Sequence, residues 1–156
     1  MTTHQTKWAD LDKLRVGRFG EYFAKMAFAK AGYDVYTPEV DDRAIDLVVR
    51  IDGMPARYLE MQVKTVRMEK PNYVFMRKRL FPISPERFLA LVVLYEKQDP
   101  QLYIIPSTAW TNPEAPFVSR DYLGKKSEPE HGLTVSCSTL QMLESYRFNA
   151  ATVLAA

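Results

Sequence analysis

The stretch IDLVVRIDGMPARYLEMQVKTV, residues 45–66, predicts two β-strands joined by a tight turn. Residues 45–51 are rich in β-branched side chains, as is usual for a strand, and they end at Asp52-Gly53, a pair that favours a hairpin. Residues 58–66 then alternate between apolar and polar side chains, which is the pattern of a strand with two unlike faces. We therefore expect a hairpin at the centre of a β-sheet.

The polar face of the second strand carries a row of side chains that can do chemistry. Leu59, Met61 and Val63 fall on one face, and Glu60, Gln62 and Lys64 fall on the other. On the first strand, Asp46 is a carboxylate among apolar residues, where a charge is costly unless a metal ion or another partner neutralises it. A lysine beside carboxylates in a sheet favours metal-assisted phosphodiester hydrolysis. Magnesium suits such a site because it takes oxygen ligands and keeps several waters.

A long helix is expected before the hairpin, over residues 8–31. Apolar residues recur there at intervals of three to five, as one stripe of a helix would: Leu11, Leu14, Phe19, Phe23, Ala27 and Ala31. Gly32 follows, at a position where helices commonly end in a left-handed residue. Gly17 and Gly20 each cost about 1 kcal/mol relative to alanine inside a helix. That cost indicates either a close approach of the backbone to a neighbour or a break near Gly17.

The remaining sequence predicts further strands and short helices. Short strands are expected at residues 33–36 and 73–76, a buried central strand at 88–95, and its neighbour at 102–105 after a turn at 98–100. Ser84-Pro85-Glu86 is typical of a helix start, residues 106–132 of a loop with four prolines, and Ser138 of the cap of a last helix with Leu140, Leu143 and Tyr146. This order predicts an α/β sandwich with a mixed sheet. We expect a single domain over residues 1–156, loop-rich from about 106 to 156.

The sequence around the hairpin resembles the PD-(D/E)XK nuclease superfamily. The similar parts are Gly20-Glu21 on the helix, residues 45–49 on the first strand and residues 62–64 on the second. Within the superfamily, the chain is most similar to the Holliday-junction-resolvase-like and restriction-endonuclease-like branches. The resemblance covers residues 16–66, about a third of the chain. It implies a restriction-endonuclease-like core, at residues 16–105, with a central mixed β-sheet flanked by helices.

The resemblance also implies roles for individual residues. Asp46 would be the metal-binding aspartate, and Gln62 would occupy the acidic position of the acid-x-lysine motif. Lys64 would be the catalytic lysine, Glu21 the helix carboxylate that approaches the metal, and the backbone carbonyl of Val63 a further ligand. The implied cofactor is Mg²⁺ or Mn²⁺, with no organic cofactor.

The sequence departs from the family pattern at two positions. Pro38 lies eight residues before Asp46, so the expected proline is displaced. Gln62 offers a carbonyl oxygen but no charge, which would hold a metal more weakly than a second acid. Glu60, on the same face, and Asp42, close to the aspartate strand, are candidate helpers.

Positive charge is concentrated after the motif. Residues 64–87 carry a net charge of +5, whereas the rest of the chain carries −3. Such a block indicates either a local anionic partner or a solvated strand face. Beside a nuclease motif it favours DNA. The predicted nucleic-acid-binding residues are Arg67, Lys70, Arg77, Lys78 and Arg79.

Several aromatic residues are interleaved with this basic run. Tyr73, Phe75 and Phe81 could stack on bases at a distorted or single-stranded site. Aromatic residues are more often part of the core, and we expect the same of Trp8 and Trp110.

Composition excludes several other classes of protein. The chain has one cysteine, Cys137, and two histidines, so neither a Cys/His zinc set nor an internal disulfide is available. Cys137 is expected to be a small buried residue. No apolar run approaches the roughly 20 residues that cross a bilayer, and residues 1–10 lack the apolar core of a signal peptide. We therefore expect a cytoplasmic protein with no membrane partner.

Three hypotheses follow from the sequence. The first is a divalent-metal-dependent DNA endonuclease, for which a homodimer would suit cleavage of symmetric substrates. The second is a catalytically inactive nuclease-fold protein that binds nucleic acid or a protein partner. The third is an unrelated α/β module with a structural ion pair. The sequence does not specify the preferred DNA structure, the choice between DNA and RNA, or the pathway.

Overall fold

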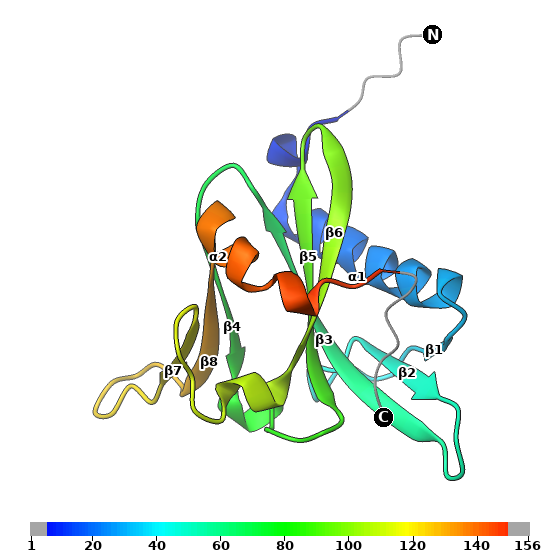
Figure 1. Cartoon of the computed structure of the whole chain (residues 1–156). Coiled ribbons are helices and arrows are strands. Elements are labelled where there is room, and N and C mark those ends of the chain that lie inside the picture. The colour runs from blue at the N-terminus through cyan, green and yellow to red at the C-terminus, as the bar shows by residue number, and fades with distance from the viewer. Residues whose placement is uncertain (1–5, 150–156) are drawn as a thin grey trace, which may run out of the picture.

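The computed structural model describes residues 6–149, which form a mixed α/β structure with two β-sheets (Figure 1). The strands are β1 (Asp34–Tyr36), β2 (Leu47–Ile51), β3 (Arg57–Arg67), β4 (Asn72–Arg77), β5 (Arg87–Tyr95), β6 (Gln98–Pro106), β7 (Phe117–Arg120) and β8 (Glu130–Val135). The helices are α1 (Lys13–Lys30) and α2 (Cys137–Met142), with short 3-10 helices η1 (Trp8–Asp10), η2 (Lys78–Leu80), η3 (Ser107–Trp110) and η4 (Glu144–Tyr146). The central sheet has the order β1-β2-β3-β5-β6, and the second sheet has the order β4-β8-β7. None of the helices between residues 6 and 149 has the length and apolar character of a membrane span.

The expected hairpin forms the β2–β3 pair of the central sheet. Its antiparallel register runs from Ile51 opposite Arg57 to Leu47 opposite Met61, which confirms the prediction. Strand β2 begins at Leu47, so Asp46 lies just before the strand rather than within it. On its other edge β3 pairs in parallel with β5, and this pairing makes the sheet mixed, as predicted.

Different layers cover the two faces of the central sheet. Strand β5 is buried on both faces, which explains its continuous apolar sequence. Its residues Ala90, Val92 and Leu94 belong to the core under α1, and Leu89, Leu91 and Val93 belong to the core under the second sheet. The sheet is therefore flanked by one long helix on one face and mainly by three strands on the other (Figure 1).

Helix α1 starts later than the sequence analysis predicts. Asp12 caps the helix by accepting a hydrogen bond from the backbone N–H of Arg15, while the residues from Trp8 form the separate turn η1. The predicted apolar stripe is also partly wrong, because Leu14 is 86% exposed. The buried row is spaced by four residues and consists of Val16, Gly20, Ala24 and Phe28.

The small residues in this row let the helix approach the sheet closely. A Cβ atom at Gly20 would lie 1.8 Å from Oγ1 of Thr65 on β3, so the close backbone approach predicted for Gly20 is confirmed. At Gly17, by contrast, a Cβ atom would meet no atom of residues 6–149 within 4 Å, and the helix continues unbroken. The helix ends as predicted at Gly32, whose φ is +94°.

Two expectations for the second half of the chain are wrong. Ser84-Pro85-Glu86 begins no helix, because the hydroxyl of Ser84 accepts from the N–H of Glu86 in a turn that leads into β5. The region between residues 106 and 132 is loop over slightly more than half of its length, as expected, but β7 and the start of β8 also lie in it and pair with each other. The turn before β6 is at Glu96-Lys97, two residues earlier than expected.

The last helix is capped by Ser136 and not by Ser138. The hydroxyl of Ser136 accepts from the N–H of Thr139, and the side chain of Thr139 accepts from the N–H of Ser136 in return. Cys137 is exposed, which corrects the expectation that it is buried, because it occupies the first position of this short helix. Leu140 and Leu143 pack into the core as expected.

Candidate active site

Asp46 lies where β2 and β3 stop pairing. Its backbone N–H donates to the carbonyl of Met61 at 2.8 Å, one step beyond the last paired residue of β2. Its carboxylate Oδ2 accepts from the backbone N–H of Val63 at 2.7 Å. Asp46 therefore continues the strand pairing with its side chain in place of a backbone.

This arrangement leaves the carbonyl of Val63 directed toward the aspartate. Met61 points its backbone groups toward the β2 edge, since its carbonyl accepts from Asp46. Residues two apart on a strand direct their backbone groups to the same edge, so Val63 does likewise. The ladder of β2 ends at Leu47 opposite Met61, and the Val63 carbonyl thus faces the gap beside the Asp46 carboxylate.

Helix α1 brings a second carboxylate, Glu21, close to Asp46. Its side chain is 26% exposed, and Oε2 accepts from Nη1 of Arg18 at 3.0 Å. Burial and then the negative charge of Asp46 raise the pKa of Glu21, against the opposing effect of Arg18 and Lys25. Gly20 packs closely on Thr65, and this contact fixes the position of the neighbouring Glu21 along β3.

The pKa of Asp46 is raised for a similar reason. Burial is the main cause, partly offset by the hydrogen bond from Val63, while Asp41 raises the pKa further. The positive charges of Lys64 and Lys25 lower it. Two neighbouring carboxylates with raised pKa values form a place where a bound cation relieves repulsion.

Gln62 and Lys64 project from β3 into a pocket of about 260 Å³ that Phe75, Arg77 and Leu80 complete. Burial lowers the pKa of Lys64, Arg77 lowers it further, and Asp46 opposes the shift. The charge of Asp46 acts on the pKa of both Glu21 and Lys64. The pocket itself is lined by Gln62 and Lys64, and the two carboxylates are related to it through these charge interactions.

The residues present fit an oxygen-coordinated cation. Within residues 6–149, no group of three or more His, Cys, Asp or Glu side chains is arranged to hold a metal ion. Carbonyl oxygens would therefore have to complete a ligand set with Asp46 and Glu21. Oε1 of Gln62 is buried and accepts no hydrogen bond from any described residue, and such an atom is costly unless it has an unseen partner. Oxygen donors of this kind are those that Mg²⁺ and Mn²⁺ prefer.

The two candidate helpers behave differently from expectation. Glu60 is engaged by Arg87, whose Nη1 lies 3.3 Å from its Oε2. Asp41, and not Asp42, is the acidic neighbour that raises the pKa of both site carboxylates. The loop before β2 adopts an irregular path, with Ala44 at a φ of 53°, so sequence proximity to Asp46 did not indicate which acid approaches it.

Arg87 is a residue of the site that the sequence analysis missed. It is 3% exposed, and its guanidinium donates to the carbonyls of Arg43, Ala44 and Leu80 at 3.1, 3.0 and 2.7 Å. These bonds tie the loop that precedes Asp46 to the start of β5. The only sequence signal was an arginine directly before an apolar strand.

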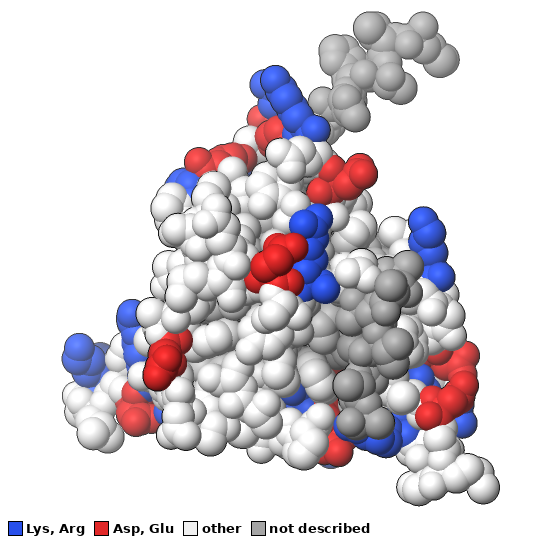
Figure 2. Space-filling view, viewed as in Figure 1, with Lys and Arg blue, Asp and Glu red and all other residues white. Residues whose placement is uncertain are grey.

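Most of the predicted DNA-binding cations already have partners within the chain. Arg77 and Arg79 lie 2.7 and 2.5 Å from the carboxylate of Glu128, and Lys78 lies 2.6 Å from Asp121. Arg67 donates to the carbonyls of Trp8, Ala9 and Leu11, which holds the N-terminal turn. Lys70 is exposed in the turn before β4. On the face shown in Figure 2, basic and acidic residues are mixed and form no single-sign patch.

The aromatic residues divide into two groups. Phe81 and Trp110 are buried, and Trp8 packs against the α1 core, as expected. Tyr73 and Phe75 are 38% and 43% exposed, so the expectation that they belong to the core is wrong. They point outward because Val74 and Met76, which alternate with them on β4, face the core.

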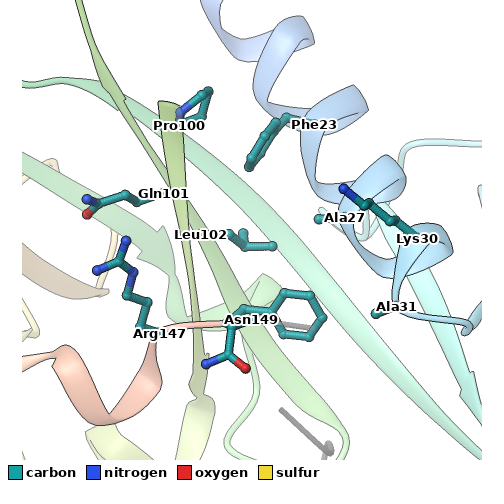
Figure 3. A pocket seen from close by; sticks show the side chains of 10 residues that line it. Phe23, Ala27, Lys30, Ala31, Pro100, Gln101, Leu102, Arg147 and Asn149 are labelled. Carbon is teal, nitrogen blue, oxygen red and sulfur yellow. The ribbon is translucent and has the colours of Figure 1, made fainter. Parts of the chain in front are cut away.

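A separate pocket of about 230 Å³ lies between α1, β6 and the segment after η4 (Figure 3). Phe23, Ala27 and Leu102 give it an apolar lining, with Lys30 and Arg147 at its border. It contains none of the predicted site residues. The candidate active site is therefore the pocket at Gln62 and Lys64 together with the neighbouring carboxylates.

Comparison with solved structures agrees with this architecture. The chain is similar to the bacterial homing endonuclease I-Ssp6803I, with a TM-score of 0.53 and 18% identity over 88% of this chain and 89% of that one. It has the restriction-endonuclease-like fold. The comparison also found Hjc from Archaeoglobus fulgidus, a Holliday junction resolvase, with a TM-score of 0.47 and 12% identity over 89% of this chain and 98% of that one. No protein-family model and no curated protein sequence matches the chain.

Proposed function

We propose that the protein is a divalent-metal-dependent DNA endonuclease that hydrolyses phosphodiester bonds. The observation that carries the proposal is the buried, unpartnered Oε1 of Gln62 in the same pocket as Lys64, whose charge interacts with Asp46. A purely structural ion pair needs no such orphaned oxygen. The restriction-endonuclease-like fold supports the proposal, because I-Ssp6803I, which shares it, is an endonuclease.

Each site residue has a part in the proposed reaction. Asp46 and Glu21 would supply the charge that holds Mg²⁺ or Mn²⁺, and Gln62 and the Val63 carbonyl would supply neutral oxygens. The ion, when bound, polarises the phosphate and acidifies a coordinated water. Lys64 positions the attacking water and stabilises the negative charge that develops on the phosphate. Arg77 lines the same pocket, and its pairing with Glu128 would have to be exchanged for contact with a phosphate.

The direct test is nicking of supercoiled plasmid by the purified protein with magnesium or manganese. We expect Lys64→Ala to reduce the nicking rate by a factor of about 10² or more, as for the loss of a group that stabilises transition-state charge. Lys97→Ala is the matched control, because Lys97 is an exposed lysine in the turn between β5 and β6. Nicking that persists in EDTA, or that survives Lys64→Ala, would contradict the proposal.

A second candidate function is binding of nucleic acid without cleavage. It is favoured by Gln62 at the position of an acid and by the absence of a three-carboxylate cluster from residues 6–149. Gln62→Glu separates the two candidates. A nuclease should keep its activity or gain metal affinity in this variant, whereas a binding protein should bind DNA with steep salt dependence and cut in neither form.

A further inference from the structure

Two aromatic rings lie side by side on the outer face of the second sheet, next to the candidate active site. The ring centroids of Tyr73 and Phe75 are 6.4 Å apart, with an angle of 22° between the ring planes. Both residues are on β4 and both are exposed on the face opposite the core. Large exposed aromatic side chains at neighbouring positions are a common feature of binding surfaces.

A glycine on the next strand makes room for the tyrosine ring. Gly132 of β8 is the register partner of Phe75, and a Cβ atom there would lie 1.9 Å from the hydroxyl of Tyr73 and 2.4 Å from its Cζ. Without a side chain at Gly132, the Tyr73 ring lies across β8, where its hydroxyl donates to Glu130. The backbone of β8 thus supports the ring from below. We call Tyr73 and Phe75 the aromatic platform.

A positively charged group lies over each ring. Cζ of Arg120 is 5.1 Å from the Tyr73 centroid, and Nζ of Lys64 is 5.6 Å from the Phe75 centroid. Of the neighbouring acids, Glu130 accepts a hydrogen bond from the Tyr73 hydroxyl, and Glu128 forms ion pairs with Arg77 and Arg79. The platform therefore combines flat apolar surfaces with cations, and its polarity suits a polyanion that has flat rings.

The platform is continuous with the candidate active site. Phe75 lines the same pocket as Gln62 and Lys64. A flat group placed on the Phe75 ring would therefore have its attached phosphate next to the lysine. In a double helix the faces of the bases are covered by stacking, so only unpaired bases can use such a surface.

We propose that the aromatic platform stacks on unpaired bases, so that the substrates of this protein are DNAs with single-stranded nucleotides beside the cleaved phosphate. This inference rests on the proposed endonuclease function and specifies its substrate class. Stacking on Phe75 and Tyr73 selects the unpaired segment, and Arg120 and Lys64 contact its phosphates. Sequence preference is expected to be weak, because every base has a π-face.

Binding can be tested in EDTA with oligonucleotides that contain 2-aminopurine, whose fluorescence is quenched by stacking. We expect tighter binding of a single strand than of the duplex of the same sequence, and quenching in the complex with the single strand. Phe75→Leu should weaken single-strand binding about ten-fold and weaken duplex binding much less. Tyr58→Leu is the matched control, since Tyr58 is 51% exposed and lies near the start of β3, before the site residues Gln62 and Lys64. Equal affinity for both forms, or an unchanged affinity in Phe75→Leu, would overturn the platform.

Cleavage in magnesium provides an independent readout with a duplex and with a duplex that carries a single-stranded flap. The platform predicts faster cleavage beside the flap, and loss of this preference in Phe75→Leu. If single strands bind as expected and nothing is cut, the platform stands and the endonuclease proposal fails. If both substrates are cut equally by both proteins, the endonuclease stands and the platform is overturned. Tighter binding of RNA than of DNA would also overturn the stated substrate class.

Discussion

At the start of β5, Arg87 holds the loop that delivers Asp46 to β3. We expect Arg87→Lys to lower the free energy of unfolding by about 1–3 kcal/mol, because the shorter lysine side chain draws its nitrogen back from the three carbonyls that Nη2 of Arg87 contacts and leaves buried acceptors without donors. Nicking should fall as well, since the position of Asp46 depends on this loop. Urea unfolding and plasmid nicking measure the two effects.

Glu60→Gln is the control for this prediction. Glu60 is half-exposed and contributes only an ion pair, so its replacement should cost less than about 1 kcal/mol. An Arg87→Lys protein that is as stable and as active as Glu60→Gln would show that the guanidinium fork is not required.

Single residues of the site differed in how well the sequence indicated them. Asp46 and Lys64 were found because a charge in an apolar strand and a regular alternation are local patterns. Arg87 and Asp41 were not, because their roles depend on the parallel pairing of β3 with β5 and on the path of the loop before β2. The roles assigned to Glu21, Asp46, Gln62, Val63 and Lys64 stay predictions until activity is measured.

At the level of elements, the packing of α1 on β3 can be tested with its two glycines. Gly20→Ala places a Cβ atom against Thr65, whose Cβ and Cγ2 lie within 3.0 Å as well as its Oγ1, so rotation of the threonine cannot relieve the clash. We expect a loss of about 1–3 kcal/mol in the free energy of unfolding, despite the better helix propensity of alanine. The measurement is urea unfolding followed by the helical circular dichroism signal.

Gly17→Ala provides the opposite expectation on the same helix. A Cβ atom there meets nothing within 4 Å, so the variant should gain up to about 1 kcal/mol from helix propensity alone. Equal effects of the two substitutions would contradict the close approach at Gly20.

The second sheet contains a buried histidine that should make its stability depend on pH. His131 of β8 lies near the rings of Phe81 and Trp110, and burial, together with Lys78, lowers its pKa below the ordinary 6.5. The unfolded chain then binds more protons than the folded chain just below pH 6.5. Stability is therefore fully present above pH 6.5 and is lost as the pH falls through this window.

His131→Phe should flatten this acid-side decline, because phenylalanine fits among the rings and does not titrate. The free energy of unfolding, measured in urea from pH 7.5 to pH 5, gives the slope for each protein. An identical slope in the parent and the variant would assign the decline to other groups.

Among the elements, the sequence predicted those with regular local patterns. The hairpin, the buried strand β5 and the end of α1 at Gly32 follow from alternation, apolar content and glycine. The face of α1 was misassigned because its buried row contains Gly20 and Ala24, which carry little hydrophobic signal. Strand β8 was missed because it pairs with β4, which is distant in the chain, and β7 was missed with it because it pairs with β8.

For the whole molecule, the candidate site predicts a stabilising effect of magnesium. Two carboxylates with raised pKa values destabilise the metal-free fold, and a cation bound only by the folded state adds about 1.4 kcal/mol at ten times its Kd. For a chain of this size, that corresponds to a rise in Tm of roughly 3–6 °C. Thermal unfolding with increasing magnesium, in the parent and in Asp46→Asn, measures it.

Asp46→Asn keeps an oxygen that can accept from Val63 but removes one negative charge. It should unfold at the same temperature with and without magnesium. A shift that persists in Asp46→Asn would place the bound ion elsewhere on the molecule.

The overall architecture was predictable only in part. The restriction-endonuclease-like core around the hairpin followed from a motif, and the mixed central sheet is confirmed. The layer that covers its second face is mainly a β-sheet, which the sequence did not indicate, because strand pairing between residues far apart leaves no periodic trace in either segment. Tyr73 and Phe75 are exposed because of their place in that sheet, and the sequence analysis therefore wrongly assigned them to the core.

The order β4-β8-β7 has a consequence for biosynthesis. Among the described strands, β4 pairs with β8 alone, from Asn72 opposite Val135 to Arg77 opposite Glu130. While a ribosome makes the intervening segment, the nascent chain has an unpaired β4 and an uncovered apolar side of β5. Contacts of such long sequence separation form slowly, and until they form the nascent chain exposes both a strand edge and a hydrophobic surface. A holdase chaperone that binds apolar strands would therefore meet this chain before residue 135 emerges and release it once β8 has docked.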